Sequence, residues 1–236
     1  MILRAEKLSS IGTLAAGAAH EILNPAGVIQ LHAEMIELDA MESEADKKSA
    51  SMIIRNVQRI KKICDDLRRF SRDETPKTIP FDPNKSLFSS LELIEPKLTQ
   101  AGVEKQIKTY GIPFIIQGDT EQIQQVLVIL LNNALDAMPT GGNLTISSQI
   151  VELNGWRHWK LAISDTGIGI SEDILPQVFD PFFTTKSPEK GTGLGLSVLH
   201  GIVETHEGEI SVESEVNVGT TFTLLLPEAG NESAVV

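Results

Sequence analysis

His20, Glu21 and Asn24 form the group of side chains in this sequence that is best suited to chemistry. An exposed imidazole has an ordinary pKa of about 6.5, so at neutral pH it is mostly uncharged and keeps one ring nitrogen free as a nucleophile. The Glu21 carboxylate can accept a hydrogen bond from the other ring nitrogen and offset the positive charge that grows during attack. These residue types suit the acceptance of a phosphoryl group, although a lone histidine on a helix is more often an ordinary surface residue.

A long helix must position this group. Apolar residues recur at spacings of three and four between about residues 3 and 38, which predicts a helix that buries one seam. At about 100° per residue, His20 lies roughly 160° to 200° around the helix from Ala18 and Ile22, and Asn24 shares its face. Pro25 removes one helical hydrogen bond, so we expect a kink just after this face. The seam comprises Ile11, Leu14, Ala18, Ile22, Pro25, Ile29, His32 and Ile36.

A second helix is predicted from about residue 45 to 71, after a short polar break that favours an antiparallel hairpin. Ile53, Ile60 and Leu67 are spaced by sevens, as in a coiled-coil seam. Two helices alone bury little surface. Pairing the hairpin with a second copy would give a four-helix bundle, so we expect a homodimer.

Composition excludes several classes of protein. The chain has 236 residues, 41% of them hydrophobic, with a formal net charge of −12, which argues against nucleic acid as the main partner. The single cysteine, Cys64, allows no internal disulfide and fits a reducing cytoplasm. It falls in an apolar stripe of the second predicted helix, so we expect its thiol to be buried. No apolar run reaches transmembrane length. A helix that begins almost at residue 1 leaves room for a preceding sensor or membrane-anchored part.

The second half of the chain predicts mixed strands and helices, in an α+β fold with helices on one face of a two-layer α/β sandwich. Three prolines interrupt the pattern at residues 72–84, which indicates an interdomain linker. Asp119 and Gln122 predict a capping-box start for one helix, and Asn154-Gly155 predicts a type I′ hairpin turn. We expect helices at about 87–100, 119–138 and 194–206, and strands at about 106–110, 114–117, 143–153, 158–165, 209–213 and 220–226.

Glycine-rich segments in this half suit nucleotide binding. Asp165 ends a strand, where a buried carboxylate can accept from an exocyclic amine such as that of adenine, while Gly167 and Gly169 let the backbone approach a flat base. Asn133 lies within an apolar helix, and Mg²⁺ bridging nucleotide phosphates would suit its amide oxygen. A second glycine-rich segment opens a helix, and the free backbone amides of its first turn can bind phosphates. This segment consists of Gly191, Thr192, Gly193, Leu194 and Gly195. Either glycine segment alone is a weak signal, because structural turns of this composition are common.

The sequence resembles the sensor histidine kinases of two-component signalling over nearly all of residues 6 to 227. EKLSSIGTLAAGAAHEILNP resembles their phospho-acceptor box. QQVLVILLNNALDAM resembles the asparagine box, DTGIGI and GTGLGLSV the two glycine boxes, and FDPFFTTK the phenylalanine box. Residues 219–222 resemble the closing glycine-threonine strand motif.

This resemblance implies the roles of the site residues. His20 would be phosphorylated by ATP, Asn133 would ligate Mg²⁺, Asp165 would bind the adenine amine and Thr220 would line the base pocket. Lys186 would lie near the phosphates. The phosphoryl group would pass to an aspartate on the receiver domain of a separate response regulator, and Asn24 would support dephosphorylation of that regulator. The implied organisation is a dimerisation and phosphotransfer domain at 1–71, the linker, a catalytic ATP-binding domain at 85–228, and a tail at 229–236.

Two positions depart from the family pattern. Ile129 stands where members commonly carry a second asparagine and where hydrolysing relatives of the gyrase type carry a glutamate base, so metal affinity and futile hydrolysis should both be low. Asp136 stands where some members place a phosphate-binding lysine. The alternatives are an ATP-hydrolysing conformational switch and a catalytically inactive dimer that binds a regulator as a scaffold.

Overall fold

The computed structural model describes residues 22–23, 26–36, 44–70, 77–109, 113–181, 183–186 and 191–230. The chain divides into two units. One comprises Met1–Glu74 with Pro181–Gly195, and the other comprises Thr75–Asp180 with Leu196–Val236. His20, Glu21 and Asn24, on which the phosphoryl-acceptor hypothesis depends, lie outside the described residues.

In the first unit, a helix over residues 26–36 and the helix α2 (Glu44–Phe70) carry small buried side chains at sevenfold spacing. Ala26 and Ala33 are buried on the first helix. Among the α2 residues whose side chains the structure describes, Ala50, Val57 and Cys64 are buried. The Lys61 ammonium donates to the amide oxygen of Gln30 over 2.8 Å, which joins the two helices.

The seam predicted on α2 is not the one that this hairpin buries. Ile53 and Ile60 are 38% and 37% exposed. Ile22, Ile29 and Ile36 of the seam predicted on the first helix are exposed as well. Sevenfold spacing alone does not say which of two apolar stripes faces the neighbouring helix. Alanine permits the closer approach, and the larger isoleucines lie outside the hairpin.

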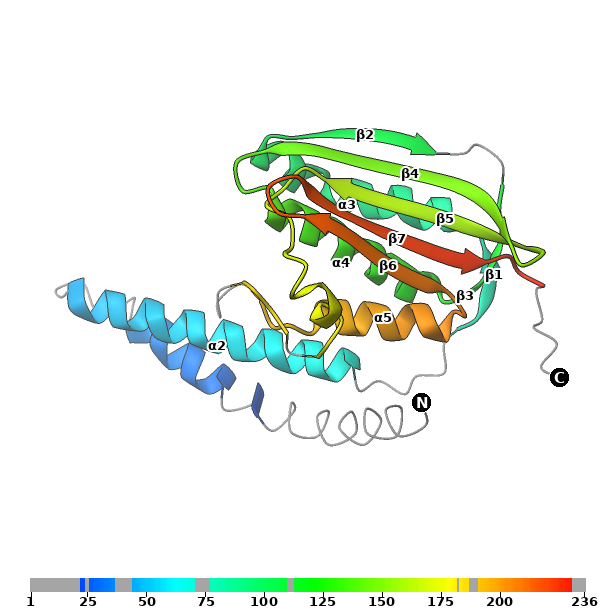
Figure 1. Cartoon of the computed structure of the whole chain (residues 1–236). Helices are drawn as coiled ribbons and strands as arrows, with labels where there is room; N and C mark the ends of the chain where they lie inside the picture. Colours follow the sequence, from blue (N-terminus) through cyan, green and yellow to red (C-terminus); the bar gives the residue numbers. More distant parts are fainter. Residues whose placement is uncertain are drawn as a thin grey trace. The chain divides into compact units, whose positions relative to one another are not determined.

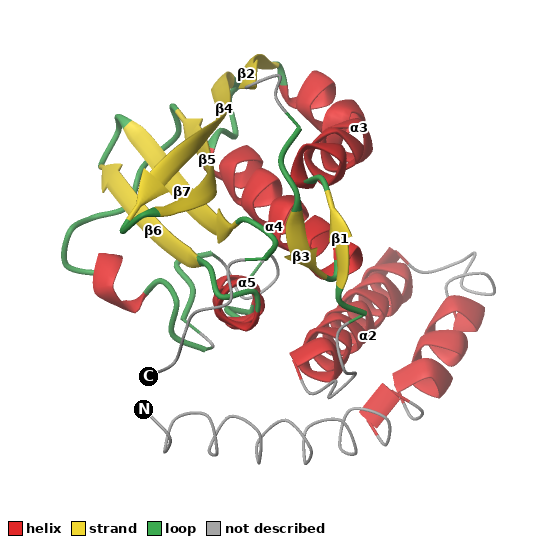
Figure 2. Ribbon diagram, turned by 90° about the vertical axis from the view of Figure 1, so that its right-hand side faces the viewer, coloured by secondary structure: helices red, strands yellow, loops and turns green. Residues whose placement is uncertain are grey.

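The second unit is built on a five-stranded sheet in the order β2-β4-β5-β7-β6. Only β2 runs parallel to its neighbour, and the other pairs are antiparallel. Figures 1 and 2 show that α3, α4 and α5 cover one face of this sheet. The strands are β2 (Val103–Thr109), β4 (Gly142–Leu153), β5 (Trp156–Asp165), β6 (Glu209–Glu215) and β7 (Gly219–Pro227), with a separate antiparallel pair of β1 (Ile79–Phe81) and β3 (Ile116–Gly118). The helices are α3 (Pro83–Ala101), α4 (Thr120–Ala137), α5 (Gly195–Thr205) and the short 3₁₀ helix η1 (Leu175–Gln177). This confirms the predicted α+β class.

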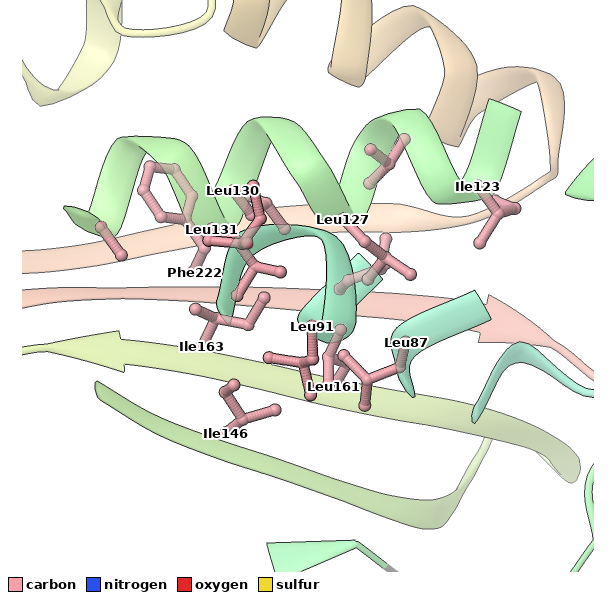
Figure 3. Close-up of a cluster of buried hydrophobic side chains, with 14 of the residues drawn as sticks. Leu87, Leu91, Ile123, Leu127, Leu130, Leu131, Ile146, Leu161, Ile163 and Phe222 are labelled. Carbon is pink, nitrogen blue, oxygen red and sulfur yellow. The ribbon is translucent and has the colours of Figure 1, made fainter. Parts of the chain in front are cut away.

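The core lies between the helices and the sheet (Figure 3). Leu127 and Leu131 of α4 are fully buried, as are Leu161 and Leu224 of the central strands. The alternation of buried and half-buried residues along β5 and β7 places one row of side chains in this core, and leaves the other row on the face without helices.

Local signals gave several of these elements correctly. Asn154 and Gly155 both have positive φ, 54° and 80°, as the type I′ turn requires. The predicted linker over 72–84 was partly wrong, because it contains β1 and the start of α3. The Asp82 carboxylate accepts from the Asn84 N–H over 2.9 Å, and Pro83 occupies the first turn, where proline needs no hydrogen-bond partner.

Across the parts of the chain that the structure describes, no helix is long and apolar enough to cross a membrane.

Candidate functional site

Asp165 and Thr220 face each other across adjacent strands. They are cross-strand partners at the end of β5 and the start of β7. Both are buried, with Asp165 only 7% exposed. The Asp165 Oδ1 accepts from the N–H of Gly167 over 2.8 Å. The structure therefore brings together two of the residues predicted to contact a base.

Burial raises the pKa of the Asp165 carboxyl above its ordinary value. Desolvation is the largest cause, because it penalises the charged form, while hydrogen bonds from the backbone of Gly167 and Thr220 act in the opposite direction. A buried carboxylate with few donors gains most from a ligand that brings another N–H donor, such as an exocyclic amine.

The loop after β5 requires glycine at positions 167 and 169, because the backbone of other elements lies where a side chain would be. A Cβ on Gly167 would lie 2.4 Å from the Ala137 carbonyl oxygen, and the next residue, Ile168, donates to that same oxygen over 3.0 Å. Gly169 has a φ of +69°, and a Cβ there would lie 2.1 Å from the Glu215 oxygen. The loop is thus held between the C-terminal end of α4 and the β6–β7 turn.

Ser214 fixes the direction of the Thr220 hydroxyl. Its Oγ donates to the Gly219 carbonyl over 2.8 Å and accepts from the Ile170 N–H over 2.8 Å. The Thr220 Oγ1 lies 2.8 Å from the same Oγ, and must be the donor because the single Ser214 proton is already used. The Thr220 oxygen can then only accept from a ligand. Sequence reasoning missed Ser214, since only the register of β6 on β7 places it here.

Asn133 lies on α4, one turn before Ala137, and is half-buried. Its single amide oxygen suits Mg²⁺ held mainly by phosphate oxygens and water, the usual arrangement for this ion. Ile129, one turn earlier, packs against the core and offers no ligand. Within the described ranges, no three His, Cys, Asp or Glu side chains gather as a metal site. The residues present therefore fit a metal that arrives with a nucleotide.

The segment from Pro181 to Gly195 belongs to the first unit. The Thr184 hydroxyl accepts from the Lys186 N–H over 3.1 Å. A Cβ on Gly191 would lie 2.4 Å from that hydroxyl oxygen and 2.9 Å from the Lys186 Cβ. The predicted cation and the first glycine of the second glycine segment are therefore neighbours. The segment continues through Thr192, Gly193, which has a φ of +71°, and Leu194 into α5 at Gly195.

Phe179, the first residue of the segment that resembles the phenylalanine box, packs inside the second unit. Its ring centroid lies 5.3 Å from that of His200 on α5 and 6.5 Å from that of Phe222 on β7. This phenylalanine therefore packs against α5 and the sheet, at the edge of the core.

Two family models match the chain. Residues 10–76 match the His Kinase A (phospho-acceptor) domain, and residues 118–230 match the histidine kinase-, DNA gyrase B-, and HSP90-like ATPase family.

Named relatives agree with these matches. Sensor kinase CckA of Brucella abortus (strain 2308) is 32% identical over 95% of this chain and 25% of its own length, and sensor histidine kinase ZraS of Escherichia coli (strain K12) is 33% identical over 95% and 47%. The crystal structure of histidine kinase ThkA in complex with response regulator protein TrrA has a TM-score of 0.70, at 26% identity over 98% of this chain and 65% of that one. The chain therefore spans about a quarter to a half of the length of these two curated relatives.

Proposed function

Because this chain belongs to the sensor histidine kinases of two-component signalling, we propose that it binds ATP with Mg²⁺ and transfers the γ-phosphoryl group to His20. The observation that carries the nucleotide part is the Asp165–Thr220 pair. A buried carboxylate and a hydroxyl oxygen restricted to accepting face each other beside a glycine loop held by Ala137 and Glu215. Such a pair suits the amine edge of adenine.

The proposed transfer is an in-line displacement. A neutral ring nitrogen of His20 attacks the γ-phosphorus, the N–P bond forms as the bond to the bridging oxygen breaks, and ADP leaves. Glu21 accepts a hydrogen bond from the other ring nitrogen and so stabilises the positive ring. Lys186 and the amides of Gly191 to Gly195 would neutralise and orient the phosphates, and most of the rate would come from positioning. Mg²⁺, held through Asn133, would supply further neutralisation of phosphate charge.

The phosphoryl group would then pass to an aspartate on a separate response regulator. The solved complex of the similar kinase ThkA with the response regulator TrrA supports this class of partner. We assign the acting form to a cytoplasmic homodimer built on the helical hairpin. Asn24, one helical turn after His20, would orient a water toward the regulator's phosphoaspartate and make the chain a phosphatase as well. The decay of a phosphorylated receiver domain, measured with and without the chain, tests this activity, and an unchanged rate excludes it.

The kinase proposal is tested by incubating the chain with γ-labelled ATP and magnesium. We expect base-stable, acid-labile label on the parent protein. A His20→Ala variant should lose this label and keep its affinity for ATP within about threefold, because donor and acceptor lie in separate domains. Release of phosphate without labelling would support the ATP-hydrolysing switch, and neither reaction would support the scaffold. Acid-labile label retained on the variant would exclude His20.

A further inference from the structure

His206 is a buried histidine that the proposed chemistry does not use. Its side chain lies at the end of α5 and only 7% of the residue is exposed. The ring Nδ1 lies 2.8 Å from the Ile202 carbonyl oxygen, and Nε2 lies 3.0 Å from the backbone nitrogen of Asp119. A carbonyl can only accept and a backbone N–H can only donate. The proton is therefore on Nδ1, and Nε2 is the acceptor.

This bond replaces the local one that the sequence predicted. The Asp119 carboxylate caps α4 by accepting from the N–H groups of Glu121 and Gln122, as expected. In a capping box, the Gln122 side chain would return a bond to the Asp119 N–H. That N–H goes instead to His206, 87 residues away. The Gln122 amide oxygen is buried and has no hydrogen-bond partner among the described residues. The Asp119 N–H is therefore used in a hydrogen bond between the ends of two helices, which we call the Asp119–His206 tie.

The backbone beside this bond is shaped around the ring. A Cβ on Gly118 would lie 2.3 Å from the His206 Cδ2 and 2.6 Å from Nε2. Only glycine leaves room there for an imidazole to reach the Asp119 N–H. Glycine at 118 and histidine at 206 thus form one contact from two distant parts of the chain.

The Asp119–His206 bond lies at the C-terminal end of α5, the helix that begins at the last glycine of the second glycine segment. α5 has 11 residues and follows directly on Gly191 to Leu194. Its Leu199 and Val203 are buried in the core, but apolar contacts are not directional and set the axial position of a helix only loosely. The His206 bond is directional, and it joins the C-terminal end of α5 to the N-terminal end of α4, the helix that carries Asn133.

We propose that His206 is a positioning residue for nucleotide binding. By accepting from Asp119 it joins the C-terminal end of α5 to the start of α4, and so fixes the position of the helix that carries Asn133. The effect on nucleotide affinity rests on the proposed function, whereas the hydrogen bond and its tautomer do not.

Two substitutions separate the bonds of the ring. In His206→Gln the amide oxygen can replace Nε2 as acceptor, and in His206→Asn the amide nitrogen can replace Nδ1 as donor while the acceptor is lost. Leaving a buried N–H unpaired weakens binding by about tenfold if the tie positions the site. We therefore expect the Kd for ATP to rise about tenfold in the asparagine variant and to stay within about threefold of the parent in the glutamine variant. The labelling rate at saturating ATP should change less than threefold in both. His158→Asn, at the opposite end of β5 from Asp165, is the matched control and should bind ATP as the parent does.

The ring of the parent protein gives an independent readout. Nitrogen NMR of nucleotide-free protein should show His206 protonated at Nδ1 and bare at Nε2. A signal from a protonated Nε2 would overturn the tie, even if the asparagine variant fails to fold. A folded asparagine variant that binds ATP as tightly as the parent would overturn the positioning role, as would equal weakening in both variants. A parent chain that shows the expected tautomer but binds no ATP would count against the proposed function and the positioning role, and leave the tie standing.

Discussion

At the scale of single residues, Asp165 is subject to opposing demands. A ligand with an amine donor needs a carboxylate at this position, but burial penalises the charge when no ligand is bound. The Gly167 and Thr220 backbone groups offset only part of this penalty, since the pKa remains raised. A buried carboxylate of this kind lowers the stability of the nucleotide-free protein and raises its affinity for a ligand that carries an amine donor.

Asp165→Asn should therefore change the pH dependence of stability. The native pKa lies above the unfolded value of about 3.8, so between these two values the native state holds more protons and the free energy of unfolding falls as pH rises. The variant lacks this fall. In urea unfolding of nucleotide-free protein, the variant should gain stability relative to the parent from pH 4 to pH 7, while its affinity for ATP drops at least tenfold. A stability difference that does not vary with pH would contradict the assignment of the raised pKa.

At the scale of elements, the C-terminus of α5 combines a favourable turn with an unfavourable residue. Gly208 donates to the Val203 oxygen over 2.9 Å and Glu207 to the Glu204 oxygen over 3.0 Å, the two bonds of a Schellman motif. The motif requires a left-handed residue, and Glu207 adopts it with a φ of 55°. A side chain with a Cβ is strained in that conformation.

Glu207→Gly should stabilise the second unit by up to about 1 kcal/mol, because glycine removes the backbone strain of the left-handed conformation. The greater conformational freedom of glycine in the unfolded chain offsets part of this gain. Thermal unfolding in the absence of nucleotide measures the change. Gly208→Ala is the matched control and should destabilise, since its Cβ would lie 2.5 Å from the Leu225 oxygen. A lower melting temperature for the Glu207 variant would show that the side chain has a role that this geometry does not include.

The elements also show how far the sequence alone could go. The α4 cap at Asp119, the Asn154-Gly155 turn and the two-layer class follow from local signals and were predicted. Ser214 and the Asp119–His206 bond depend on which strands and helices become neighbours. No pattern within a few residues carries that information, and the local rule for Gln122 pointed to a different bond.

At the scale of the whole molecule, the hairpin leaves apolar stripes uncovered. Ile53 and Ile60 are exposed on α2, Ile29 and Ile36 are exposed on the helix over residues 26–36, and Ile22 is exposed as well. Several large side chains at sevenfold spacing form a continuous apolar strip, which is typical of an interface. A second copy of the hairpin would cover these residues in a four-helix bundle.

Replacing Ile53 and Ile60 together by glutamate should weaken dimerisation at least 100-fold, because a symmetric interface would bury four added charges. Sedimentation over a range of concentrations measures the dissociation. Leu93→Glu, at an exposed position of α3, adds a charge outside the hairpin and should leave the dimer intact. A parent chain that sediments as a monomer at every concentration would overturn the bundle.

The two tryptophans of the chain, Trp156 and Trp159, both lie on β5 in the second unit. Trp159 is fully buried and its indole N–H donates to the Asn84 amide oxygen over 3.2 Å, whereas Trp156 is 47% exposed. Tryptophan fluorescence consequently reports on the sheet of the second unit, because the helical hairpin contains no tryptophan. Far-ultraviolet circular dichroism, in contrast, detects the helices of both units. With Trp156 replaced by phenylalanine, one buried fluorophore would follow the sheet alone, so the order in which the two units melt can be recorded without attaching a dye.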